Sequence, residues 1–69
     1  MFEKYDSVIG VTAESSSKGT FVDLVGGYVG WISKKYIPKG MTVMCTVCKV
    51  KEDGFPILNL DSIRYAEAM

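Results

Sequence analysis

The chain has 69 residues, of which eight are Lys or Arg and eight are Asp or Glu, so its formal net charge is zero and its length permits one domain, residues 1–69. A hydrophobic fraction of 48% is that of a globular chain rather than a disordered one, and no apolar run reaches the roughly 18 residues of a membrane span. Histidine and the glycine-rich phosphate-binding motifs are absent, so we expect a protein that is not an enzyme and needs no cofactor.

The opening residues of the chain lack the basic and apolar regions of a signal peptide, which predicts a cytoplasmic protein.

The first half of the chain predicts three strands. The β-branched residues 7–13 form the first expected strand, and a polar turn over 14–19 leads to the second, residues 20–25. Gly26 and Gly27 are a strong hairpin signal, so residues 28–33 should pair with the second strand in antiparallel orientation.

The second half predicts two more strands and a terminal helix. Residues 34–40 read as a loop with at most one helical turn, followed by the longest strand, residues 41–51. The fifth strand, residues 55–60, contains Pro56, which has no N–H for a sheet and should lie at an edge or a bulge. Asp61 and Ser62 are expected to cap a short C-terminal helix that runs through Ala68.

Cys45 and Cys48 form a C-x-x-C pattern within the fourth expected strand. A zinc site would need two further ligands, and the chain has no other Cys and no His. Residues three apart in a strand lie about 10 Å apart, beyond the roughly 7 Å reach of a disulfide. We therefore expect a buried, apolar Cys45, a partly exposed Cys48 and no metal site, with zinc shared between two chains as the alternative.

Five short strands at regular spacing predict an all-β fold, and the small size favours a closed barrel, since closure removes exposed sheet edges. Alternating apolar residues of three strands supply the expected interior: Val22, Leu24, Val43, Cys45, Val47, Leu58 and Leu60. The first strand leaves two inner sets open, Val8-Gly10-Thr12 or Ile9-Val11-Ala13.

Charge is segregated along the chain. Residues 18–51 hold six Lys and one Asp, a net charge of +5, and the remaining residues carry −5. Phe21 alternates with the inward Val22 and should therefore face outward, with Trp31 near it on the paired strand. Exposed aromatic rings beside lysines are what single-stranded nucleic acids bind. The alternatives are that Trp31 fills the barrel or packs under the 34–40 loop, and that the lysines only confer solubility.

The glycine-spaced strings of this chain resemble a known family. They are Gly10-Val11-Thr12, Gly19-Thr20-Phe21-Val22-Asp23-Leu24 and Gly26-Gly27-Tyr28-Val29-Gly30-Trp31-Ile32, with Gly40, Val43, Val47, Gly54, Leu58 and Leu60 in the later positions. Over residues 6–60 the chain resembles the S1-type RNA-binding domain. The resemblance implies a five-stranded antiparallel OB-type barrel that binds single-stranded RNA or DNA. Lys18 and Ser33 stand where the family commonly has an aromatic residue and a histidine.

These observations predict a small nucleic-acid-binding module that prefers single-stranded RNA and binds it weakly, with low sequence specificity. The expected binding residues are Phe21, Trp31, Lys18, Lys34, Lys35, Tyr28, Tyr36, Lys49 and Lys51. The alternative is a protein-interaction barrel that docks on a larger protein or self-associates. No membrane partner is expected, and the chain should be a monomer or a weak homo-oligomer.

Overall fold

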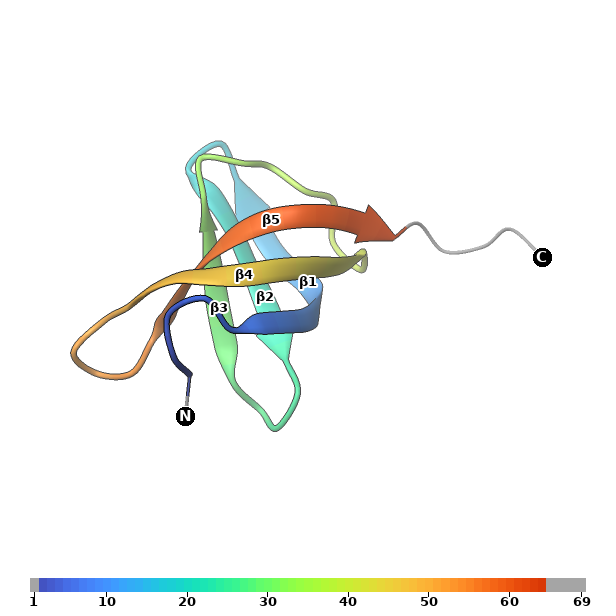
Figure 1. The fold of residues 1–69 in the computed structure, drawn as a ribbon. Helices are drawn as coiled ribbons and strands as arrows, with labels where there is room; N and C mark the ends of the chain where they lie inside the picture. The colour runs from blue at the N-terminus through green and yellow to red at the C-terminus, as the bar shows by residue number, and fades with distance from the viewer. Residues whose placement is uncertain (1, 65–69) are drawn as a thin grey trace.

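The computed structural model describes residues 2–64, which form a closed barrel of five strands (Figure 1). The strands are β1 (Ser7–Ser16), β2 (Gly19–Leu24), β3 (Val29–Ser33), β4 (Thr42–Val50) and β5 (Pro56–Arg64). Around the barrel they follow the order β1-β2-β3-β5-β4, and β4 pairs with β1 to close it. The expected all-β barrel is confirmed, and this arrangement is consistent with an OB-type fold. Within residues 2–64 there is no helix of the length and apolar character needed to cross a membrane.

One of the five pairings is parallel. β3 runs alongside β5 with Trp31 beside Ile57 and Ile32 beside Leu58, whereas the other four pairings are antiparallel, as expected. In the barrel order β5 lies between β3 and β4 and pairs with both. The parallel pairing places the outward side chains of β3 next to those of β5.

The prediction that a C-terminal helix begins at Asp61 and Ser62 is wrong. Asp61 and Ser62 lie inside β5, which continues its pairing with β4 as far as Arg64 opposite Thr42. The Thr46 hydroxyl donates a 2.6 Å hydrogen bond to Asp61 Oδ2, so this carboxylate serves the sheet instead of a helix cap. The rest of the expected helix, residues 65–68, lies outside the described residues.

The interior matches the predicted alternation. The buried apolar side chains are Val22, Leu24, Ile32, Ile37, Val43, Cys45, Val47 and Leu58, and Leu60 packs against them while half-buried. On β1, Gly10 and Thr12 are buried while Ile9 and Val11 are exposed. The inner set of the first strand is therefore Val8-Gly10-Thr12.

A loop between β3 and β4 crosses one end of the barrel and contributes a core residue that the sequence did not predict. Ile37 is only 2% exposed. Its N–H donates to Thr20 Oγ1 at 3.1 Å, and the same hydroxyl donates to the Lys35 carbonyl at 2.7 Å. The hydroxyls of Thr12 and Ser15 hold the following part of the loop in the same way. The segment is a loop, as expected, without the one helical turn that the sequence allowed, and side-chain hydrogen bonds fix it.

The β2–β3 hairpin has the glycine turn that the sequence predicts. Gly26 and Gly27 have φ values of +86° and +82°, in the left-handed region that side chains disfavour. The Leu24 N–H donates to the Tyr28 carbonyl at 2.7 Å and closes the turn. The turn sets the register of β2 against β3, and with it the pairing of their outward aromatic residues.

Candidate nucleic-acid interface

Phe21 and Trp31 form an aromatic pair on the outside of the barrel. They are direct partners across β2 and β3, with ring centroids 4.7 Å apart and planes tilted by 57°. Their neighbours Val22 and Ile32 point into the core, so the two rings point outward. Phe21 is 42% exposed and Trp31 is half-buried. The expected pair is confirmed, and the alternative that Trp31 fills the barrel interior is wrong.

A shallow hollow lies beside this pair. It measures about 210 Å³, and β1 and β2 line it together with the two rings: Glu14, Ser15, Ser16, Gly19, Phe21 and Trp31. The absence of a side chain at Gly19 leaves space for the indole, since a Cβ at this position would overlap the carbons of the Trp31 ring. An aromatic edge next to a polar strand leaves room for a flat ring to stack.

The pair belongs to a row of outward side chains across four strands. Trp31 lies beside Ile57 of β5, and Ile57 lies opposite Lys49 of β4. A β-bulge puts Lys49 in this row. The β4–β5 register shifts between Val47 and Lys49, so that Val47 points inward, Lys49 is exposed and Val50 packs against the core. Simple alternation from Val47 would have turned Lys49 inward.

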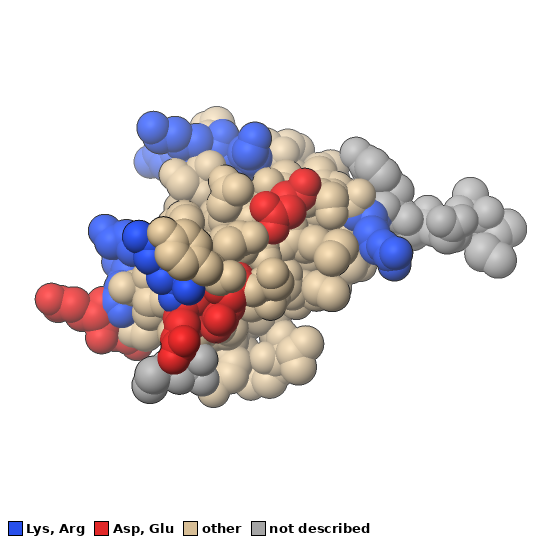
Figure 2. Space-filling view, in the orientation of Figure 1, with Lys and Arg blue, Asp and Glu red and all other residues tan. Residues whose placement is uncertain are grey.

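A group of lysines lies at the end of the barrel nearest the hollow. The Lys34 N–H donates to the Lys18 carbonyl at 2.8 Å, just beyond the Gly19–Ser33 pair, and Lys35 follows in the loop. All three are exposed. Figure 2 shows basic side chains gathered at the top of the view, where Figure 1 places the β1–β2 turn and the start of the β3–β4 loop. A polyanion that reaches Phe21 and Trp31 therefore meets cations at this end.

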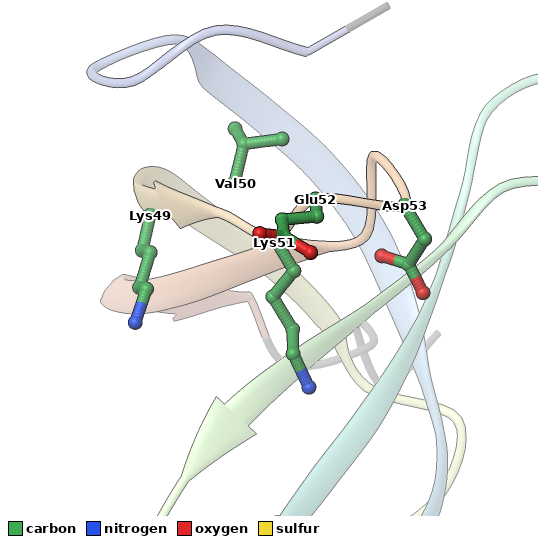
Figure 3. A pocket seen from close by; sticks show the side chains of 5 residues that line it. All are labelled: Lys49, Val50, Lys51, Glu52 and Asp53. Carbon is green, nitrogen blue, oxygen red and sulfur yellow. The ribbon is translucent and has the colours of Figure 1, made fainter.

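A second lysine group lies at the β4–β5 turn. Figure 3 shows Lys49 and Lys51 extending to the same side of the chain, with Val50 on the opposite side, around a hollow of about 540 Å³. Glu52 and Asp53 follow in the turn, so this end has mixed charge. Basic and acidic side chains accordingly adjoin on the left of Figure 2. On the face shown in Figure 2, the basic side chains thus form separate groups and not one continuous patch.

Tyr28 and Tyr36, the two tyrosines predicted as binding residues, do not line the hollow beside the Phe21–Trp31 pair. Tyr28 is at the hairpin end of β3, where its ring meets Phe2 edge to face with a centroid distance of 5.3 Å. Tyr36 is 66% exposed in the β3–β4 loop and lines none of the hollows named here. The structure therefore gathers Phe21, Trp31, Lys18, Lys34 and Lys49 around β2, β3 and β5. It leaves Tyr28 and Lys51 toward the β4–β5 turn, and Lys35 and Tyr36 on the loop.

Three apolar residues of this region were not predicted as site residues. Ile57 completes the outer row, while Phe55 and Phe2 line a larger hollow beside Tyr28. The alternation of the predicted fifth strand could have identified Ile57 and Phe55. If Leu58 points inward, the adjacent Ile57 points outward, and so does Phe55 two residues before it. Phe2 had no such signal, since the N-terminal segment has no strand period.

The cysteines occupy the environments expected of them. Cys45 is buried and Cys48 is exposed at the bulge. Burial, together with the charge of Asp61, raises the pKa of the Cys45 thiol from 9.0 to about 11. Among residues 2–64, His, Cys, Asp and Glu side chains do not gather in groups of three or more that could hold a metal ion.

Comparisons with protein-family models, curated proteins and solved structures found no match for this chain. The functional interpretation therefore depends on the geometry of the outer face.

Proposed function

We propose that this chain is a non-catalytic module that binds nucleic acid, prefers single-stranded RNA, and does so weakly and with low sequence specificity. The observation that carries the proposal is the outward Phe21–Trp31 pair, with Lys49 at the end of its row and the exposed Lys18 and Lys34 just beyond the Gly19–Ser33 end of the same two strands. The resemblance to S1-type domains supports the same function. A cytoplasmic location stays a prediction.

The physical basis is stacking combined with phosphate attraction. Stacking on an aromatic side chain contributes about 1–3 kcal/mol per base and tolerates any base, because every base has a π-face. OB-type barrels bind oligonucleotides on the face of strands two and three and on the loops β1–β2 and β4–β5, which is where Phe21, Trp31, Lys18 and Lys51 lie. Two stacking platforms and a few lysines give affinities in the micromolar range or weaker.

The single tryptophan of the chain provides a label-free test. Titration with a single-stranded RNA octamer at low salt should quench Trp31 fluorescence in a saturable way, because a base stacks on the indole. The DNA octamer of the same sequence should bind less tightly, and the RNA duplex should compete poorly because its bases are already stacked. An unchanged fluorescence signal, together with unchanged anisotropy of a labelled octamer at low salt, would refute the proposal.

A specific surface favours a second candidate function, self-association through the opposite wall of the barrel. Ile9 and Met44 are direct partners on β1 and β4, and they are 53% and 40% exposed. Val11 beside them is 45% exposed. An apolar outer patch of this kind is typical of an interaction surface. A sedimentation coefficient that rises with protein concentration would favour this function. The substitution Met44→Lys should abolish that rise.

A further inference from the structure

A hollow lies where the β2–β3 hairpin meets the β4–β5 turn. It measures about 610 Å³, within the size range of small-molecule sites, and is lined by Phe2, Gly27, Tyr28, Val29, Asp53, Gly54, Phe55 and Pro56. Phe2 and Tyr28 meet edge to face on it. Val29 and Phe55, which precede the paired Trp31 and Ile57 by two residues each, both line it. Three of its eight lining residues carry aromatic rings: Phe2, Tyr28 and Phe55.

This hollow continues the face of the aromatic pair. Val29 precedes Trp31 by two residues on the same outward side of β3, a distance of about 7 Å along the strand. Phe55 precedes Ile57 by two residues, immediately before β5 begins at Pro56. A flexible strand with one base on Trp31 can therefore place a following base among Phe2, Tyr28 and Phe55.

One carboxylate gives the hollow a chemical preference. Asp53 Oδ1 accepts a 3.0 Å hydrogen bond from the Phe55 N–H, which holds the carboxylate in the turn. Within residues 2–64 this is the hydrogen bond that the carboxylate makes, and Asp53 lines both this hollow and the neighbouring one at Lys49 and Lys51. An ionised carboxylate only accepts hydrogen bonds, so it favours a ligand that offers an N–H. Cytosine presents an N4 amino group as a donor at the position where uracil presents the acceptor O4.

We infer that this hollow is a second base-binding site for the same strand, and that Asp53 makes it favour cytosine over uracil. The inference depends on the proposed nucleic-acid binding, and it adds a limited base preference to a face that otherwise binds by stacking. The Phe21–Trp31 pair supplies binding without choice of base, and the hollow supplies the choice.

The test compares oligocytidine and oligouridine hexamers by quenching of Trp31. The wild-type chain should bind oligocytidine about fivefold more tightly, the effect of one hydrogen bond of ordinary strength. Asp53→Asn keeps an acceptor for the Phe55 N–H but adds an amide that can donate to O4, so the preference should disappear. Glu52→Gln makes the same change of charge one residue earlier, outside the lining of the hollow, and should retain it. Tyr28→Ala, which truncates an exposed side chain, should weaken binding of both hexamers.

The outcomes separate this inference from the proposed function. Equal affinities for the two hexamers, or a preference that persists in Asp53→Asn, would overturn the inference while quenching of Trp31 still supports nucleic-acid binding. Amide shifts at Tyr28 and Phe55 that respond to an arginine-containing peptide and not to oligocytidine would also overturn it. If the wild-type chain shows neither quenching of Trp31 nor a change in the anisotropy of a labelled oligonucleotide, both the inference and the proposed function are overturned.

Discussion

Trp31 lies directly against the backbone of Gly19. A Cβ at position 19 would overlap the indole carbons of Trp31 and the carbonyl oxygen of Ile32, and Gly19 also has a φ of +155°. The aromatic platform on β3 therefore depends on the missing side chain of a residue at the start of β2.

Gly19→Ala should displace the indole. We expect a shift of the Trp31 emission maximum, about tenfold weaker binding to a single-stranded RNA octamer as one platform is lost, and a loss of about 1–3 kcal/mol in the free energy of unfolding. Gly40→Ala is the matched control, because Gly40 has a φ of +88° but open space where its Cβ would lie. It should cost stability without changing emission or binding, and equal effects of both substitutions on emission would contradict the role of Gly19.

Phe21→Ala should weaken RNA binding by roughly 5- to 150-fold, corresponding to the 1–3 kcal/mol of one stacked base. Phe21 is 42% exposed, so the fold should tolerate its truncation. Tyr36→Ala, which removes a more exposed ring from the β3–β4 loop, should leave affinity unchanged. Anisotropy of a labelled octamer measures both variants, and equal losses would show that the pair has no special role.

The lysines at the β1–β2 end should determine part of the salt dependence. Replacing Lys34 and Lys35 together by Ala should reduce the slope of log K against log salt by about 1.4, if each contacts one phosphate of a single strand. Lys4→Ala with Lys39→Ala removes the same charge from segments outside the proposed face. An identical slope change in both double variants would indicate general attraction by net charge.

Thr20→Val should loosen the loop that carries these lysines. The substitution keeps the shape but leaves the buried Ile37 N–H and the Lys35 carbonyl without their hydroxyl partner. Urea denaturation should show a loss of about 2–4 kcal/mol, the cost of leaving buried polar groups unpaired. Thr46→Val, which removes a hydrogen bond to the exposed Asp61, should cost less than about 1 kcal/mol.

The two thiols should differ in reactivity. At pH 8 Cys48 should react with an aromatic disulfide reagent, whereas Cys45 is buried and its pKa of about 11 keeps it protonated. One thiol per chain should react in the native protein, two in urea, and none in native Cys48→Ser. Because the folded-state pKa is raised, the folded chain holds the proton more tightly, and the contribution of Cys45 to stability falls as pH rises from 9.0 toward 11. Cys45→Val should lack that component of the decline.

The sequence predicted much of the barrel because its local signals agree with its tertiary pairing. Gly26 and Gly27 fix the β2–β3 register, and an inward Val22 alternates with the outward Phe21, which is enough to place Phe21 next to Trp31. The alternation of the fifth strand likewise placed Leu58 in the core. These features depend on near neighbours along the chain or across one hairpin.

The features that were missed depend on partners distant in the sequence. Asp61 resembles a helix cap until β4 extends beside it and Thr46 donates to its carboxylate. The bulge at Cys48 reverses the direction of Lys49, and a period-2 pattern cannot show an extra residue. Ile37 reads as part of a polar loop, and the hydrogen bond that holds this loop over the barrel end comes from Thr20 of β2, 17 residues earlier.

The joint between β3 and β5 has a consequence for how the molecule responds to a ligand. This joint is the shortest of the five registers between the described strands, and it consists of the Trp31–Ile57 and Ile32–Leu58 pairs. Trp31 and Ile57 thus belong both to the proposed binding face and to the β3–β5 pairing that closes the barrel. An oligonucleotide bound across both residues would stabilise the β3–β5 pairing, so ligand binding and barrel closure are thermodynamically linked. Without a ligand, opening of the barrel should begin at the β3–β5 pairing.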